Sequence, residues 1–163
     1  MDLASDIEQL RHHEDVLRFA AFDQATAWAL GSRLKALADE RQVAVTIEVR
    51  LGGEPVFFHA MPGTAPANAD WARRKRNTVE LLQQSSYRVG RELQRDASTL
   101  QARMGLPERD YASHGGSFPL RLANGLCIGS VTVSGLPQRD DHALVVQALA
   151  ELCGVAPATV ALP

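Results

Sequence analysis

A single lysine interrupts the apolar face of a helix that the sequence predicts from about residue 70. Trp71, Lys75, Val79 and Leu82 fall on one stripe at helical spacing. A lysine on such a stripe must extend its ammonium group to water or meet an anion. A partly desolvated ammonium beside an indole ring can bind a carboxylate or the edge of a ligand ring. The pattern therefore favours Lys75 as a pocket residue, with extension to solvent as the alternative.

The segment His114-Gly115-Gly116 precedes a predicted strand and is a second candidate for contact with a ligand. Glycine lets a backbone approach a ligand closely, and successive N–H groups can form a concavity that holds an anion. His114 adds a side chain that titrates near neutral pH or ligates a metal. A simple turn into the strand is the alternative, and no GxxxxGK[ST] phosphate loop occurs in the sequence.

The remaining reactive side chains are assigned structural roles. Asp140 and Asp141 stand at the predicted start of the last helix, where capping and the helix dipole favour acids. With His142 they form a carboxylate–histidine pattern, but capping is the preferred interpretation. Zinc-type histidine spacing is absent, so we expect no metal site from these residues. Cys127 and Cys153 are too far apart for a CxxC motif, and we expect free thiols.

Length and composition predict one globular domain. The chain has 163 residues, of which 45% are hydrophobic, and 17 bases against 19 acids give a net charge of -2. This balance disfavours a broadly basic nucleic-acid binder. No run of about 18 apolar residues is present to span a bilayer, and the N-terminus does not resemble a signal peptide. We expect a cytoplasmic protein with neither nucleic acid nor membrane as a partner.

The charge is nevertheless unevenly distributed. Residues 73–109, called here the basic stretch, contain nine bases and four acids, a local net charge of +5. A solvated helix surface is the preferred interpretation, because runs of charge usually face water. An anion-binding site is the alternative.

The hydrophobic pattern predicts helices on both faces of a mainly antiparallel sheet, an α+β fold. Strict alternation of apolar and polar residues predicts a strand over residues 43–51, and the Gly52-Gly53 turn leads into a second strand over 55–61. The Asn124-Gly125 turn predicts a further hairpin of strands over 117–122 and 126–134. Helical spacing predicts one helix from residue 23 to 40, two helices or one kinked helix from 70 to 104, and a last helix from 140 to 153. We interpret residues 1–20 as an N-terminal arm or helix, 21–155 as a single α+β domain, and 156–163 as a frayed C-terminal tail.

Several short motifs, in order along the chain, together resemble a known family. They are Gly63-Thr64 with Asn68 and Trp71, Arg74-Lys75, Ser85-Ser86-Tyr87 with Gly90, His114 to Pro119, and Ile128 to Gln138 followed by Asp141-His142. The set resembles the conserved family of small cytosolic proteins grouped with the GlcG-like and HbpS-like haem-binding or haem-degrading domains, over residues 20–155. The resemblance implies a profilin-like or PAS-like α-β-α sandwich with a five-stranded sheet, and symmetric homo-oligomers.

The resemblance also selects candidate ligand-binding residues. The positions that match the family motifs are Trp71, Lys75, Ser86, His114, Gly115, Gly116 and Ser134. If haem is the cofactor, His114 is the expected axial ligand, while Arg74 and Lys75 could pair with the propionates. Apart from His114 in that case, no metal-ligating residue is expected.

Three functions remain open from the sequence. The preferred one is a small-ligand-binding domain, for haem or another planar, carboxylate-bearing molecule, in a homo-oligomer. The first alternative is a non-enzymatic structural or adaptor oligomer, with Trp71 and Tyr87 among its subunit contacts. The second is a haem-degrading enzyme, which needs an electron donor and an iron ligand that no recognisable motif displays.

Overall fold

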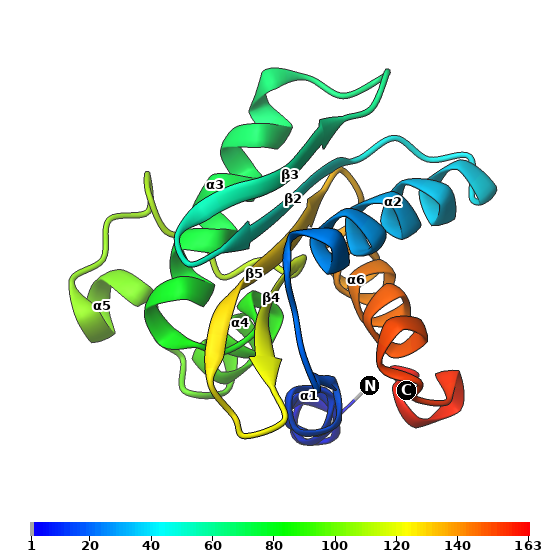
Figure 1. The fold of residues 1–163 in the computed structure, drawn as a ribbon. Coiled ribbons are helices and arrows are strands. Elements are labelled where there is room, and N and C mark those ends of the chain that lie inside the picture. Colours follow the sequence, from blue (N-terminus) through cyan, green and yellow to red (C-terminus); the bar gives the residue numbers. More distant parts are fainter. Residues whose placement is uncertain (1) are drawn as a thin grey trace.

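Two antiparallel hairpins form most of a five-stranded sheet with the order β1-β4-β5-β2-β3 (Figure 1). The computed structural model describes residues 2–163. The pairing of β1 with β4 is parallel and the other pairings are antiparallel, as expected for a mainly antiparallel sheet. The strands are β1 (Arg18–Phe19), β2 (Thr46–Leu51), β3 (Glu54–Ala60), β4 (Ser117–Leu122) and β5 (Cys127–Ser134).

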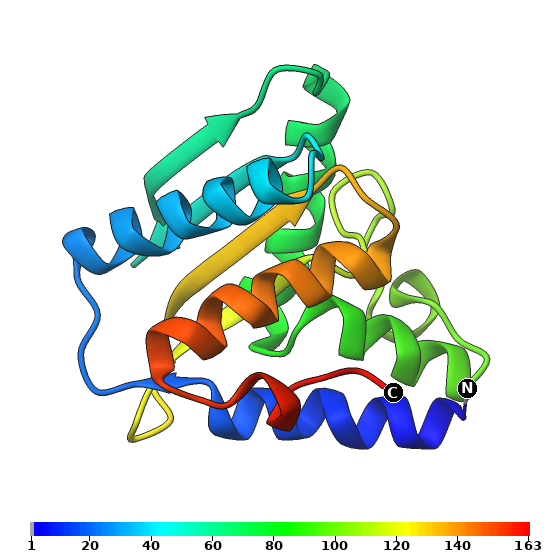
Figure 2. The same ribbon diagram turned by 90° about the vertical axis from the view of Figure 1, so that its right-hand side faces the viewer.

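Helices cover both faces of this sheet, which confirms the predicted α-β-α sandwich. Helices α2 and α6 pack on one face and α3 on the other (Figures 1 and 2). Within residues 2–163, none of the helices has the length and hydropathy needed to cross a membrane. The helices are α1 (Leu3–Val16), α2 (Gln24–Glu40), α3 (Pro66–Leu82), α4 (Ser86–Arg95), α5 (Leu100–Met104) and α6 (Gln138–Cys153), followed by a 3-10 turn at Pro157–Thr159.

The main core lies between the sheet and the helices α2 and α6. Ile47 and Val49 of β2 alternate with more polar residues, and both side chains are fully buried, as the alternation predicts. Val131 and Val133 of β5 are buried beside them, and Leu34 of α2 covers this layer. The opposite face of β5 is therefore free to face α3, where the site residues lie.

The region predicted as two helices or one kinked helix is divided at Gln83, which adopts a left-handed conformation and ends α3. Pro66 occupies the first turn of α3, where its missing N–H costs nothing, so the helix begins earlier than expected. The Ser85 hydroxyl then accepts the N–H of Arg88 and caps α4, and Gly105 ends the short α5.

Both ends of the chain pack on the rest of the molecule. Ile7 and Leu10 of α1 are buried, and α1 lies against α4. The expected fraying of residues 156–163 is wrong, because the Gln9 amide donates hydrogen bonds of 3.0 and 3.1 Å to two tail carbonyls and Val160 is buried. The boundaries of the domain itself stay a prediction.

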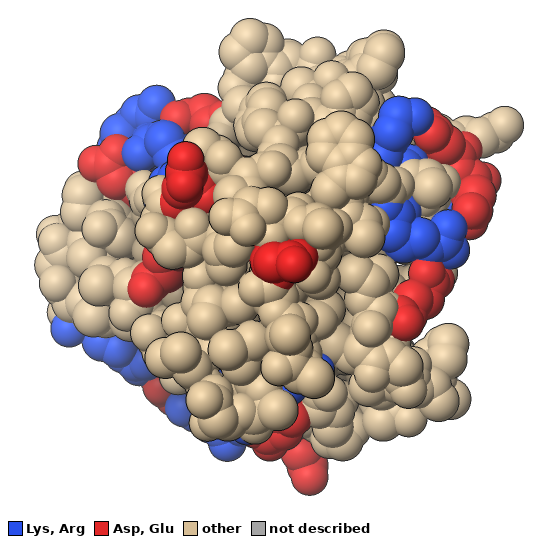
Figure 3. Space-filling model, in the orientation of Figure 1, with Lys and Arg blue, Asp and Glu red and all other residues tan. Residues whose placement is uncertain are grey.

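The surface is not uniformly charged. In the orientation of Figure 1, Lys, Arg, Asp and Glu gather toward the margins of the molecule (Figure 3). The middle of this face is largely uncharged, apart from isolated acidic side chains. Such a surface can cover a partner at little desolvation cost.

Candidate functional site

A cavity of about 280 Å³ opens where α3, the end of β5, the loop before β4 and the start of α6 meet. Four residues selected from the sequence line it: Trp71, Lys75, His114 and Ser134. Residues that lie 63 positions apart in the chain are brought together here by the pairing of β4 with β5 and by α3 crossing behind them. The other lining residues are Asn68, Gly135, Leu136, Gln138 and Asp141.

The Lys75 ammonium group is buried at this cavity. Its side chain donates hydrogen bonds to the Val133 carbonyl at 3.0 Å and to Asp141 Oδ2 at 2.9 Å, and the residue is 3% exposed. The alternative of extension to solvent is therefore wrong. An ammonium group carries three N–H donors. Two have acceptors among residues 2–163, which leaves one for a ligand.

Asp141 is the counterion of this lysine rather than the helix cap expected from the sequence. Pro137 occupies the cap position of α6, without a side-chain hydrogen bond. The Asp141 carboxylate instead accepts a hydrogen bond from the Lys75 ammonium group. It also accepts hydrogen bonds from the backbone N–H groups of Gly135 at 3.3 Å and Leu136 at 3.0 Å. Desolvation lowers the pKa of Lys75 and raises the pKa of Asp141. Burial thus destabilises the charged forms of both residues, and their mutual attraction and hydrogen bonds offset this desolvation.

His114 lies at the mouth of the cavity, where its ring meets the edge of Trp71 at a centroid distance of 5.0 Å. Desolvation, with smaller contributions from Lys75 and Arg74, lowers the pKa of His114. The imidazole is therefore neutral at pH 7, the form that ligates metals. Neither of its ring nitrogens makes a hydrogen bond within residues 2–163, so both are available to a ligand.

Arg74 lies outside the cavity, on the other side of Trp71. Its guanidinium stacks 4.2 Å from the Trp71 ring centroid and donates to the Glu108 carbonyl at 3.0 and 2.5 Å. It lines a second hollow of about 450 Å³, which shares Trp71 and His114 with the first. These two aromatic side chains form the wall between the two hollows.

The two glycines serve close packing more than an anion-binding concavity. The Gly115 N–H already donates to Gln138 Oε1 at 3.1 Å. A Cβ atom at Gly116, where φ is +130°, would lie 2.7 Å from Lys75 Nζ and 2.3 Å from the Val133 carbonyl oxygen. A side chain at position 116 would therefore displace the lysine.

Ser86 is placed behind this loop and not in the cavity. Its hydroxyl accepts the Ser117 N–H at 3.0 Å and donates to the Ser117 carbonyl at 3.3 Å, in a buried position. Ser86 therefore fixes the start of β4, and with it the direction in which His114 leaves the strand.

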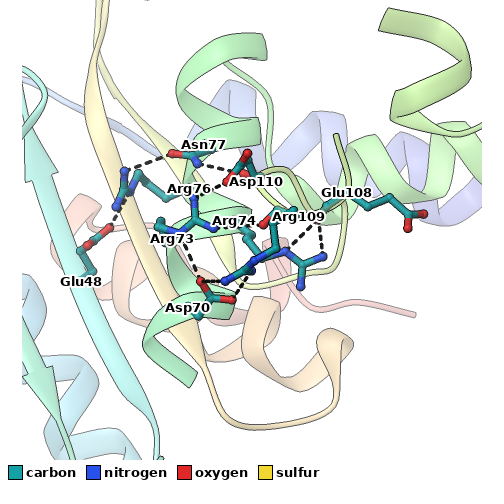
Figure 4. Close-up of polar contacts among 9 residues, drawn as sticks. All are labelled: Glu48, Asp70, Arg73, Arg74, Arg76, Asn77, Glu108, Arg109 and Asp110. Carbon is teal, nitrogen blue, oxygen red and sulfur yellow. Dashed lines mark hydrogen bonds and ion pairs between the residues drawn. The ribbon is translucent and has the colours of Figure 1, made fainter. Parts of the chain in front are cut away.

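The basic stretch is compensated by acids from outside it. Asp70 binds both Arg73, at 3.2 Å, and Arg109, at 2.6 Å, and Glu48 binds Arg76 at 3.0 Å (Figure 4). Acids that precede the stretch in the sequence thus neutralise part of its charge. These three arginines hold α3 to the sheet and to the loop after α5, and their acid partners leave them closed to an added anion.

A buried histidine pair supports the helix that carries Asp141. His13 Nδ1 lies 3.1 Å from His142 Nε2, and both side chains are fully buried, so the segment expected as an arm or helix is a helix packed on the fold. Tyr87 and Phe118 pack on the His142 ring at 5.2 and 6.0 Å. Burial lowers the pKa of His13 to about 4 and that of His142 well below its ordinary value. Both rings are therefore uncharged at neutral pH.

The cysteines do not form a nucleophilic centre. Cys127 and Cys153 are free thiols, as expected. Burial raises the pKa of both, to about 11 for Cys153, so neither is a thiolate at neutral pH.

Comparison with known proteins identifies the family. A family model described as haem degrading protein HbpS-like matches residues 22–150. The chain belongs to the HbpS-like family. This confirms the resemblance that the motifs carry.

Relatives of this HbpS-like chain cover nearly its whole length. A UPF0303 protein of Azotobacter vinelandii is 56% identical over 150 residues, which are 92% of this chain and 90% of the relative. A UPF0303 protein of Serratia proteamaculans is 46% identical over 155 residues, 95% and 96% of the two chains.

Solved structures show the same HbpS-like fold. The Ybr137w protein superposes with a TM-score of 0.84 at 25% identity, over 91% of this chain and 87% of its own. A PduOC:Heme complex has a TM-score of 0.69 at 20% identity, over 80% and 94%. A double mutant of Streptomyces reticuli HbpS has a TM-score of 0.65 at 20% identity, over 80% and 86%.

Proposed function

We propose that this HbpS-like protein binds a small planar molecule bearing a carboxylate in the cavity lined by Trp71, Lys75, His114 and Ser134. The observation that carries the proposal is the buried Lys75 ammonium, which retains one unused N–H at a cavity that no side chain fills. A buried charged group and an unfilled cavity each lower the stability of a fold, and ligand-binding sites commonly contain both.

The polar groups at the cavity suit the acceptor oxygens of a carboxylate. Besides Lys75, the Ser134 hydroxyl and the Gln138 amide line the cavity, and each has a donor to offer. Asp141 balances the lysine charge, so directed N–H and O–H donors, rather than excess positive charge, would hold the anion. Trp71 supplies a flat apolar wall for a planar ligand.

Benzoate tests this proposal because it is planar, carries one carboxylate and has no reactive carbonyl group. We expect Lys75→Met to weaken benzoate binding about 10- to 100-fold in calorimetric titration, the range for a lost charged hydrogen bond. Lys35→Met, the same change at an exposed lysine, should leave the affinity unchanged. Ser134→Ala should weaken binding about threefold to tenfold. Equal affinity in wild type and Lys75→Met would contradict the proposal.

Haem is one specific candidate for this ligand, and the residues fit it in part. The neutral, unbonded His114 suits an axial ligand, and Arg74 Nη1 makes no hydrogen bond within residues 2–163, so it could meet a propionate. The smaller cavity suits a ligand of the size of benzoate rather than a macrocycle, so haem would have to use both hollows beside Trp71. When bound, haem would supply a redox-active iron.

A haem titration tests this candidate. We expect a shifted Soret band in the wild type and its loss in His114→Ala, because no other histidine lines either hollow. An unchanged shift in His114→Ala would remove that residue as the ligand. No shift at all would remove haem while leaving benzoate binding to be decided by calorimetry. Haem degradation stays a prediction that needs haem binding first.

Self-association is a second property that we propose, and a specific surface favours it. Trp28 of α2 is 67% exposed, and Phe58 of the edge strand β3 is 53% exposed. Phe57 contacts the Trp28 ring edge-on at 5.5 Å and links the two elements. Tyr87, expected as a subunit contact, is buried within the chain instead. An unpaired strand edge beside large apolar side chains suits pairing with a second copy.

Light scattering at several dilutions tests self-association. We expect the wild type to exceed the mass of one chain and the Trp28→Arg/Phe58→Glu variant to approach it. Leu126→Glu is the matched control, because Leu126 is equally exposed but lies at the turn before β5. A monomeric wild type, or equal assembly in all three proteins, would contradict this interface.

We also propose that the protein is cytoplasmic, a prediction that the two free thiols support.

A further inference from the structure

Lys75 stands out against the composition of the chain. The sequence contains 15 arginines and only two lysines, Lys35 and Lys75, and positions 73, 74 and 76 are all arginine. Arginine stays protonated under biological conditions, whereas a buried lysine can become a neutral amine. The basic residue at the cavity is therefore the one cation of its helix that can act as a nucleophile.

We propose that the Lys75 amine forms a Schiff base with the carbonyl carbon of a small aldehyde or 2-oxo acid bound in the cavity. The inference rests on the proposed function, since it names the substrate class and the chemistry of that same site. Desolvated lysines are the usual amines of this reaction.

The geometry leaves the amine accessible from the cavity and places a proton acceptor beside it. Lys75 lines the cavity, and its Nζ lies 2.9 Å from Asp141 Oδ2. Glycine at position 116 lets Nζ keep its place at the cavity, because a Cβ atom there would approach Nζ to 2.7 Å and displace it. His114 is the other titratable group at the cavity, and it is neutral at pH 7.

Burial of Lys75 and Asp141 favours the neutral amine of Lys75, which is the form that reacts with a carbonyl group. Desolvation lowers the pKa of Lys75 and raises that of Asp141. Both shifts reduce the free-energy gap between the ion pair and the neutral amine with a carboxylic acid. One proton transfer across the hydrogen bond therefore gives a neutral amine, and rotation about the Cε–Nζ bond turns its lone pair from Asp141 toward the cavity.

The step balances with these two residues and the carbonyl compound alone. The ammonium proton passes to Asp141, and the amine attacks the carbonyl carbon as the C=O π bond breaks. A second amine proton moves to the resulting oxygen and gives a neutral carbinolamine. Asp141 then returns its proton to the hydroxyl group, water leaves, and the C=N bond forms. The products are a protonated imine on Lys75, the Asp141 carboxylate and one water molecule, with no oxidant or reductant.

Lys35 provides an internal control. It is an exposed lysine on α2, paired with Asp39 at 2.6 Å across one helical turn. It lines neither hollow beside Trp71, so no bound carbonyl compound is held against its amine. The two lysines therefore differ in burial while sharing the same chemistry.

Reductive trapping tests the inference. The protein is incubated with pyruvate and sodium cyanoborohydride at pH 7, and the secondary-amine adduct is located by peptide mass spectrometry. We expect the adduct at Lys75 in the wild type and in Lys35→Arg, and its absence at position 75 in Lys75→Arg. Adduct at Lys75 should exceed that at Lys35, because Lys75 lines the cavity that holds the carbonyl compound and Lys35 does not.

The outcomes separate this inference from the proposed function. No adduct at Lys75, or equal labelling of both lysines, overturns the Schiff base. If benzoate still binds in that case, the ligand-binding proposal stands and only the covalent chemistry falls. If neither adduct nor benzoate binding is found, both fail. The wild type and Lys35→Arg leave the cavity intact, so the test holds even if Lys75→Arg does not fold.

Discussion

Replacing Asp141 with alanine should lower the free energy of unfolding by about 3–5 kcal/mol, the cost of leaving a buried charge without its partner. Lys75 is 3% exposed, and its ammonium group would keep only the Val133 carbonyl as an acceptor. The N–H groups of Gly135 and Leu136 would lose their acceptor as well. The loop between β5 and α6 would then lose the contacts that hold it against α3.

Urea denaturation of a double-mutant cycle measures this effect. We expect Lys75→Met/Asp141→Ala to be more stable than Asp141→Ala alone, because removing both charges also removes the unpaired ammonium. Ser134→Ala, at the same cavity but outside the ion pair, is the control and should change stability by about 1 kcal/mol or less. A loss below about 1 kcal/mol for Asp141→Ala, or strict additivity in the cycle, would show that the ion pair is not buried.

Acid should destabilise the protein between about pH 6.5 and pH 4, through the buried histidine pair. An unfolded histidine binds a proton near pH 6.5, whereas burial lowers the pKa of folded His13 to about 4. Unfolding therefore takes up protons in this window, so stability is complete above it and falls as the pH falls. His13 alone accounts for about 3 kcal/mol, and His142 acts in the same direction.

A matched variant isolates this contribution. Burial raises the pKa of Glu14 and of Asp141, and a raised carboxyl pKa favours the folded state as the pH falls, which opposes the histidines. The His13→Asn/His142→Gln variant keeps amide groups near the two bonded ring nitrogens but does not titrate here. We expect urea unfolding of this variant to show a smaller loss of stability from pH 6.5 to 4 than the wild type, with the lowered pKa of His114 contributing to the loss that remains. The same acid loss in variant and wild type would exclude the histidine pair as its cause.

Local patterns predicted the features that neighbouring residues determine. The alternation around Ile47 and Val49 located a central strand, since a half-buried strand requires that spacing. The stripe of Trp71 and Lys75 located the cavity, because a lysine on an apolar face needs either a path to water or an acceptor inside the fold. The two-residue strand β1 left no such signal, because alternation cannot appear in two residues.

Contacts between distant segments were not predictable in this way. The Lys75–Asp141 pair joins residues 66 positions apart, and an acid at a helix start looks the same in sequence whether it caps the helix or meets a lysine. The ion pair of Arg76 with Glu48 was unpredictable for the same reason, because Glu48 lies on β2, outside the basic stretch. The buried role of His13 had no signal in the sequence, because its partner His142 lies 129 positions away.

A crystal structure of the protein with benzoate tests ligand binding most directly. We predict density for the ring against Trp71, with the carboxylate within hydrogen-bond distance of Lys75 Nζ and of the Ser134 hydroxyl, and with the Lys75–Asp141 contact retained. A cavity closed by side chains, or benzoate bound only elsewhere on the molecule, would contradict the assignment of this site.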